Sequence, residues 1–318
     1  MIDKTQVLGF LQKTLRFNGT EEQLEVLHHG SIHLPDSTIK CIVSNPDGAD
    51  YFMLISAVNS PDAIARAAKN ICDIQAKLPK DFATTILSPI VSGTIDGRSC
   101  AVWPRHEPFI PSNPMFFRLF FKWRRMFHRK SFLDWAYDLC AHTISGPLAT
   151  ESIDSGFIKP LQHIEANNAL PDDMRQHAHI ALQRIRNRQW RPMHCVQHGD
   201  LWYGNFLFPV SHNRRDSAKF YVIDWGGATI DGYPVFDFTR LAIAMECNAR
   251  SASLHIDRLT RLLGCERIDI ASYVLCAIGE MATRLEHFPE QQFHLLSTST
   301  YLSIRDMALG EKASLSGY

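Results

Sequence analysis

Residues 196–208 read VQHGDLWYGNFLF, two apolar runs that enclose a polar loop. Asp200 and Asn205 stand five positions apart in this loop, so the flanking strand-like runs hold both side chains on a rigid frame. The alternative is a purely structural role, because Asx side chains stabilise turns by bonding their own backbone. The stretch predicts either a turn or a site that uses a carboxylate and an amide together.

Residues 220–227 read FYVIDWGG and add a second acid on a loop. Asp224 follows an apolar, strand-like run and precedes two glycines; its structural alternative is the N-cap of a helix. Phosphoryl transfer from a nucleotide needs an aspartate to orient the acceptor hydroxyl, and an asparagine and a second aspartate to hold magnesium against the phosphates. Asp200, Asn205 and Asp224 supply this set in the right order, so the sequence predicts phosphoryl transfer.

Residues 232–237 read GYPVFD and complete a succession of three motifs. HGDxxxxN, IDW and GYPVFD in this order resemble the aminoglycoside phosphotransferase/choline kinase branch of the protein-kinase-like fold. The resemblance extends over residues 193–241. It implies an enzyme, a kinase that phosphorylates an alcohol group, with Mg²⁺ and ATP as cofactors and GTP as the alternative donor.

The same resemblance implies a role for each motif residue. Asp200 is implied to be the catalytic base, and Asn205 belongs to the catalytic set with it. Asn205 and Asp224 are implied to be the magnesium ligands, while His198 shapes the loop and Asp237 braces it as a buried carboxylate.

The hydrophobic pattern changes near residue 105, from mainly strand-like before it to mainly helical after it. This change predicts two lobes of an α+β, bilobal protein-kinase-like fold. Residues 1–104 are expected to form a small N-terminal antiparallel-sheet lobe that covers the nucleotide. Residues 105–318 are expected to form a larger helical C-terminal lobe for catalysis and acceptor binding. Turn residues and hydrophobic spacing predict strands over 38–43, 51–55, 85–91 and 99–103, and helices over 62–78, 115–128, 131–144, 172–189, 236–249, 269–287 and 290–309.

The predicted nucleotide grip departs from the family in two places. The family carries a lysine on the third strand, which grips the nucleotide phosphates, and a glutamate on the next helix. Here the strand 51–55 reads YFMLI, and the helix over 62–78 offers no glutamate. The phosphate-covering loop 29–37 has a single glycine, Gly30, for close backbone approach to phosphate, so Gly30 is its predicted nucleotide-binding residue.

Lys40 is the predicted replacement for the missing strand lysine. A two-residue turn at Pro46–Asp47 would pair Lys40 with Met53, and opposed residues share one face of a sheet. Lys40 would then extend over the nucleotide from the neighbouring strand. The alternative is a solvated strand lysine, because a slip of one residue reverses the face.

Residues 115–130 read MFFRLFFKWRRMFHRK and predict an amphipathic helix. A basic stripe of Arg118, Lys122, Arg125 and Arg129 opposes an aromatic stripe of Phe116, Leu119, Phe120, Trp123 and Phe127. Basic amphipathic helices rich in Phe and Trp lie in membrane interfaces. The alternative is a surface helix that packs its aromatic face on the large lobe.

Composition excludes several classes of protein. The chain has 318 residues with 33 basic and 33 acidic side chains, globular values that exclude disorder and a dedicated nucleic-acid binder. Its eight cysteines include no CxxC pair, and we expect them to be free and buried. No secretory leader and no run of about 18 apolar residues is visible. We therefore expect a cytoplasmic protein, at most peripheral at the inner face of the membrane.

Together these inferences predict a phosphotransferase that uses ATP and Mg²⁺ to phosphorylate a hydroxyl group of a small molecule or a glycan. The basic segment 118–130 favours a phosphorylated or membrane-linked acceptor, such as a cell-envelope saccharide. A second hypothesis is a catalytically silent, kinase-like binding or scaffold protein. It is motivated by the missing strand lysine and helix glutamate.

Overall fold

The computed structural model describes residues 3–28, 38–45, 48, 50–109, 117–146, 148–209, 219–285 and 289–310, and only the backbone of residues 117–120. The chain folds into two compact units. Unit 1 comprises residues 1–110 and 204–227, and unit 2 comprises residues 111–203 and 228–318. The segment 204–227, which carries Asn205 and Asp224, therefore belongs with the N-terminal residues and not with the helices around it in sequence.

Unit 1 is built on an antiparallel sheet of five strands in the order β1-β2-β3-β5-β4. Side chains alternate between its faces, as in β2, where Ile39, Cys41 and Val43 are buried and Lys40 is exposed. Asp96 and Gly97 both have positive φ and close the β4–β5 hairpin. The strands are β1 Leu24–His28, β2 Thr38–Val43, β3 Tyr51–Ser56, β4 Val91–Ile95 and β5 Arg98–Pro104.

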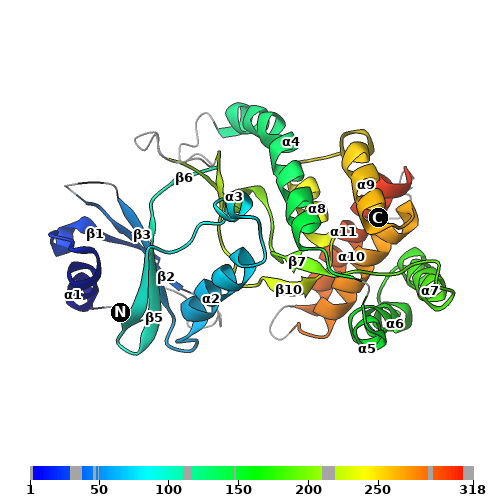
Figure 1. Cartoon of the computed structure of the whole chain (residues 1–318), viewed down its shortest axis with the longest axis horizontal. Coiled ribbons are helices and arrows are strands. Elements are labelled where there is room, and N and C mark those ends of the chain that lie inside the picture. Colours follow the sequence, from blue (N-terminus) through cyan, green and yellow to red (C-terminus); the bar gives the residue numbers. More distant parts are fainter. Residues whose placement is uncertain are drawn as a thin grey trace. The chain divides into compact units, whose positions relative to one another are not determined.

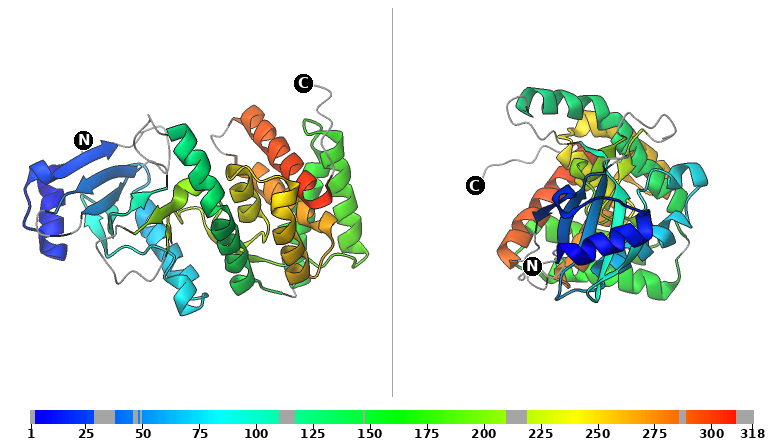
Figure 2. Two further views of the ribbon diagram at one scale, coloured as in Figure 1. Left: turned by 90° about the horizontal axis from the view of Figure 1, so that it is seen from above. Right: turned by 90° about the vertical axis from the view of Figure 1, so that its left-hand side faces the viewer.

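Two helices cover the two faces of this sheet (Figure 1). Helix α1, Lys4–Leu15, packs on one face and crosses in front of the strands in the right-hand view of Figure 2. Helix α2, Ala63–Gln75, follows Asp62 as predicted and packs Ile64 on the opposite face. The α1 face joins Val7, Leu8 and Leu11 with Cys41, Met53 and Val102, and the α2 face joins Ile64, Leu87, Ala101 and Trp103 with Leu54, Leu207, Tyr221 and Ile223.

The predicted register of the β2–β3 hairpin is wrong by one residue. Lys40 pairs with Leu54, not with Met53. The reason is the connection: Val43 pairs with Tyr51, so the strands are joined by a longer loop than a two-residue turn. The end of β2 is held instead by Asn45, whose backbone N–H donates to the side chain of Asp50 at 3.2 Å.

The predicted strand over 85–91 is also wrong. Helix α3, Lys80–Ala83, precedes this stretch. The stretch then forms a single isolated β-bridge, between Ile86 and the distant Val222. The Val222 N–H donates to the Thr85 carbonyl at 2.7 Å, and the Leu87 N–H donates to the Val222 carbonyl at 3.1 Å. The partner comes from a small sheet of unit 1 formed by β6 Glu107–Pro108, β8 Phe206–Phe208 and β9 Tyr221–Val222.

Unit 2 is mainly helical, with one two-stranded sheet of β7, Cys195–Gln197, and β10, Thr229–Gly232. Helix α4 lies beside α8 (Figure 1). The helices are α4 Phe117–Thr143, α5 Thr150–Ile153, α6 Lys159–Ala166, α7 Asp172–Arg186, α8 Phe236–Ala244, α9 Ala249–Leu263, α10 Arg267–Ala282 and α11 Glu290–Leu309, and a π-helical turn, Asp154–Ile158, joins α5 to α6.

Several of the predicted helix boundaries in unit 2 are wrong, among them that of the helix expected over 269–287, which ends at Ala282. The helices expected over 115–128 and 131–144 are one helix, α4, because no glycine or proline interrupts it and Lys130 pairs with Asp134 across the expected break. The helix expected over 236–249 ends at Ala244. Glu246 then takes a left-handed φ of 53°, and Asn248 caps a new helix, α9, that the sequence analysis missed.

All eight cysteines are free, as expected, but they are not all buried. Cys72 is exposed on α2, whereas Cys247 and Cys265 lie in the connections that follow α8 and α9 and are half-buried. Within the described residues, no helix is long and apolar enough to span a membrane.

Candidate active site

The loop that carries the predicted base is held by a buried carboxylate of unit 2. Asp237, at the start of α8, accepts the His198 N–H at 2.5 Å and the Gly199 N–H at 3.0 Å. Burial raises the pKa of Asp237, while His198 and the two N–H groups act in the opposite direction. The fully buried His198 accepts the Asp200 N–H at its Nδ1, at 3.3 Å. The predicted bracing and shaping roles therefore have matching contacts.

The motif GYPVFD explains how α8 reaches this loop. A Cβ at Gly232 would lie 2.2 Å from the Cβ of Gln197, so only glycine allows β10 to approach β7. The Tyr233 N–H donates to the Gln197 side chain at 2.8 Å, and its hydroxyl donates to the Gly156 carbonyl at 2.7 Å. These contacts fix the backbone that leads to Asp237.

Asp200 itself is exposed, and it forms an ion pair that the sequence analysis missed. Nη2 of Arg240 donates to Oδ1 of Asp200. Arg240 follows Asp237 by three positions on α8, so both side chains project from the same face of the helix. That spacing was a usable signal in the sequence. Helix α8 thus contacts the backbone of the loop through one residue and the predicted base through another.

The two predicted metal ligands lie in unit 1, at the ends of β8 and β9. Asn205 directly precedes β8, and Asp224 is the second residue after the end of β9. The Ile223 N–H donates to the Asn205 carbonyl at 3.0 Å, which ties the two segments together. Asp224 is exposed and has a φ of 67°, a left-handed conformation that is strained for a residue other than glycine.

Trp225 holds this strained turn in place. Its ring is buried, and its indole N–H donates to the Val222 carbonyl at 3.2 Å. Its carbonyl accepts the side-chain amide of Asn70, on α2, at 3.5 Å. Asn70 is therefore a contact between α2 and the Asp224 turn, which sequence reasoning did not find because nothing in the local pattern distinguishes it.

The residues at the ends of β8 and β9 fit a magnesium–nucleotide complex. Magnesium prefers oxygen ligands and is usually held by one or two protein carboxylates together with water and substrate phosphates. Asn205 and Asp224 supply one amide and one carboxylate. Among the described residues, no three His, Cys, Asp or Glu side chains gather as a ready metal site. A magnesium ion held by Asn205 and Asp224 would have one protein amide and one protein carboxylate as ligands, and substrate phosphate oxygens would complete its coordination.

Lys40 lies on the α2 face of the sheet, despite the error in its predicted partner. It pairs with Leu54, and Leu54 pairs with Ala101, so the three side chains share one face. Leu54 and Ala101 belong to the apolar cluster that includes Leu207 and Ile223. Lys40 is exposed there. Gly30, the other predicted nucleotide-binding residue, lies outside the described residues.

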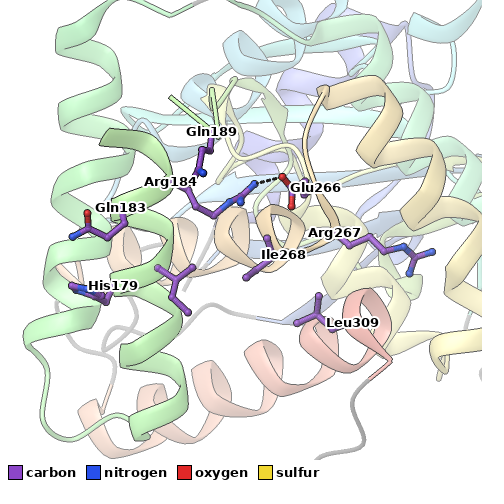
Figure 3. A pocket seen from close by; sticks show the side chains of 9 residues that line it. His179, Gln183, Arg184, Gln189, Glu266, Arg267, Ile268 and Leu309 are labelled. Atoms are coloured by element: carbon purple, nitrogen blue, oxygen red, sulfur yellow. Dashed lines mark ion pairs between the residues drawn. The ribbon is translucent and has the colours of Figure 1, made fainter. Parts of the chain in front are cut away.

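An open groove of about 570 Å³ in unit 2 contains none of the predicted site residues (Figure 3). It lies between α7, the start of α10 and the end of α11. The guanidinium of Arg184 in this groove donates to Asp269 at 2.7 and 3.0 Å and pairs with Glu266, so its charge is already satisfied.

Comparisons with known proteins agree with this arrangement. The model of the phosphotransferase enzyme family matches residues 142–270, the stretch that contains Asp200, Asn205, Asp224 and Asp237. Comparison with curated protein sequences gave no match. The match confirms the predicted resemblance, and the predicted enzyme class, a phosphotransferase, with it.

Two solved structures resemble nearly the whole chain at low identity. An aminoglycoside 2'-phosphotransferase-IIIa, solved as its GDP complex, is 13% identical, with a TM-score of 0.55 over 98% of this chain and 100% of that one. A macrolide 2'-phosphotransferase from Brachybacterium faecium is 13% identical, with a TM-score of 0.51 over 93% of this chain and 98% of that one. The predicted α+β, protein-kinase-like fold is confirmed.

Proposed function

We propose that the chain is a kinase-type phosphotransferase that transfers the terminal phosphoryl group of a nucleoside triphosphate to a hydroxyl group of a small molecule or a glycan. The observation that carries the proposal is the double support of Asp200, whose loop is held by Asp237 and whose carboxylate is held by Arg240. A turn-forming aspartate needs neither contact. A general base must be held in one orientation to accept a proton in the transition state.

ATP with Mg²⁺ is the proposed donor, and GTP is the alternative. When bound, Mg²⁺ neutralises phosphate charge that develops during transfer. Asn205 and Asp224 would hold the ion. One amide and one carboxylate are a small donor set of the kind with which proteins bind magnesium together with substrate phosphates, and this supports a magnesium–nucleotide site. Leu207 and Ile223 lie within two residues of Asn205 and Asp224 in the chain, and the apolar cluster that they form with Leu54 supports a site for the base of the nucleotide.

In the proposed reaction the acceptor hydroxyl attacks the terminal phosphorus. The new O–P bond forms as the bond between this phosphorus and the bridging oxygen breaks, and the nucleoside diphosphate leaves. The hydroxyl proton passes to the carboxylate of Asp200. Arg240 keeps that carboxylate oriented through its Oδ1 atom.

A cell-envelope saccharide is the proposed class of acceptor. Arg240 and Asp200 form a neutral ion pair, so the preference for an acidic acceptor over a cationic one comes from α4, where cations outnumber the acid. Lys122, Arg125 and Arg129 also act on the single carboxylate of Glu246. A positively charged antibiotic would meet this excess of cations, whereas a phosphorylated or acidic sugar would be attracted.

Thermal unfolding with nucleotide tests the proposal before any acceptor is known. A ligand at 100 times its Kd stabilises the folded state by about 2.7 kcal/mol. We expect ATP to raise the unfolding midpoint, and Mg²⁺ to enlarge that shift. A midpoint that neither ATP nor GTP moves, with or without Mg²⁺, would favour the alternative hypothesis of a silent, kinase-like scaffold.

Lys40 is the proposed phosphate-binding cation in place of the missing strand lysine. Lys40→Ala should raise the ATP KM or lower kcat by about tenfold or more, since a hydrogen bond to a charged group is worth ~1.5–3 kcal/mol. Lys13→Ala is the matched control, because Lys13 is an exposed lysine on α1, which covers the opposite face. Steady-state ATP kinetics of both variants measure the difference. If Lys40→Ala has the same ATP kinetics as Lys13→Ala and wild type, Lys40 is a solvated strand lysine without a role in phosphate binding.

A further inference from the structure

The first half of α4 exposes three large apolar side chains on one side. Trp123, Met126 and Phe127 are 54%, 64% and 66% exposed. The rings of Trp123 and Phe127 stack with their centroids 5.5 Å apart. Spacings of three and four residues place all three side chains on one helical face. An apolar face of this kind on a helix surface marks an interaction site.

The opposite side of the same half of α4 packs against the rest of unit 2. Phe121 is buried, and its ring packs edge-on against the ring of Tyr203 with the two centroids 5.0 Å apart. Arg125 is only 13% exposed and pairs with Glu246, beyond the end of α8. This corrects the predicted basic stripe: Arg125 faces inward and does not point to solvent. The side chains of Arg118, Phe116, Leu119 and Phe120 lie outside the described part of the chain.

The charge around the exposed face is positive. Lys122 precedes Met126 by four positions, and Lys130 follows Phe127 by three, so exposed lysines border the face on both sides. Lys130 pairs with Asp134. The positive charges of Arg125, Lys122 and Arg129 all lower the pKa of one carboxylate, that of Glu246. These three cations and one acid together carry an excess of positive charge.

We propose that the face of Trp123, Met126 and Phe127 docks on an anionic membrane surface. Tryptophan and phenylalanine bury their rings at the boundary between headgroups and acyl chains, and nearby lysines are attracted to anionic headgroups. The lysines at the border and the excess cations behind them match an anionic surface. This docking goes beyond phosphotransfer and does not depend on it.

Vesicle co-sedimentation of the full chain tests the docking. Wild-type protein should bind vesicles of phosphatidylcholine mixed with phosphatidylglycerol, and should be released as salt rises. Trp123→Ala and Phe127→Ala should each weaken the vesicle partition coefficient by roughly tenfold, from the buried ring that each removes. Lys122→Gln should weaken it by about fivefold, the worth of one cation near such a surface.

Two matched controls separate this face from its surroundings. Leu254→Ala removes a leucine of α9 that is 59% exposed, and should leave binding unchanged. The double variant Arg125→Gln with Glu246→Gln removes the ion pair on the opposite side of α4 without changing the net charge or the face of Trp123, Met126 and Phe127, and should also bind like wild type. Thermal unfolding of every variant checks that the fold is intact.

The results that overturn the proposal are specific. Wild-type protein that stays in the supernatant with anionic vesicles at low salt contradicts it. Equal binding to vesicles of pure phosphatidylcholine also contradicts it, because binding then does not depend on attraction between the cations and anionic headgroups. If wild type instead forms a dimer that Phe127→Ala dissociates, without vesicle binding, the face joins two copies of the chain.

Discussion

Asp200→Asn is expected to lower phosphoryl transfer by ~10²–10⁴-fold while leaving nucleotide binding unchanged. The amide has nearly the shape of the carboxylate but does not accept the acceptor's proton in the transition state. It also loses the ion pair with Arg240, although a hydrogen bond to the guanidinium remains available. The measurement is the single-turnover rate of nucleotide consumption, with the acceptor or with water in its place, beside nucleotide affinity by titration.

Asp231→Asn is the matched control for this substitution. Asp231 is an exposed carboxylate on β10 of the same unit, and its loss should leave both rate and affinity unchanged. If Asp200→Asn keeps more than about a tenth of the wild-type rate, Asp200 is not the general base. If the rate falls together with nucleotide affinity, the residue acts in binding instead.

Arg240→Gln separates orientation from proton transfer at the same carboxylate. If Arg240 only fixes the orientation of Asp200, the variant loses part of the rate but keeps more of it than Asp200→Asn does. The base is still present in that case. This residue was within reach of the sequence, since it lies one helical turn beyond Asp237 on α8. The pairing of Arg240 with Asp200 was not within reach of the sequence, because only the folded loop brings Asp200 to this turn of α8.

The limits of sequence reasoning are clearest in unit 1. The strands β2 and β3 follow from their alternating apolar residues, but their register depends on the length of the connecting loop. The stretch 85–91 has the apolar character of a strand, yet its partner, Val222, lies far away in sequence. Contacts between distant segments override local propensity, and local patterns do not contain them.

The helices of unit 2 were predicted better because their signals are local. Helix α11 has the predicted bounds, since Pro289 and Gly310 mark its ends. The break between α8 and α9 was missed because it depends on a left-handed residue, Glu246, whose side chain is held by Arg125 of α4. A turn made by a left-handed residue other than glycine or asparagine leaves no turn signal in the sequence.

Asp224→Ala is expected to remove the magnesium-dependent part of nucleotide binding. At a nucleotide concentration of 100 times the wild-type Kd, ligand stabilisation is about 2.7 kcal/mol. A hundredfold loss of affinity reduces that stabilisation to about 0.4 kcal/mol, so the thermal shift caused by Mg²⁺ and ATP should nearly vanish. A magnesium titration of ATP binding that is unchanged in the variant would show that Asp224 is not a metal ligand.

The backbone at Asp224 requires a second variant, because alanine is strained at a φ of 67°. Asparagine tolerates this conformation better, so Asp224→Asn removes the charge with little strain. Both variants should lose the response to magnesium, but only Asp224→Ala should also unfold earlier without ligand. Asp81→Asn, an exposed aspartate on α3, controls for the loss of one carboxylate in unit 1. If only Asp224→Ala loses the response, strain in the turn before Trp225 is the cause, and metal binding through the carboxylate is not.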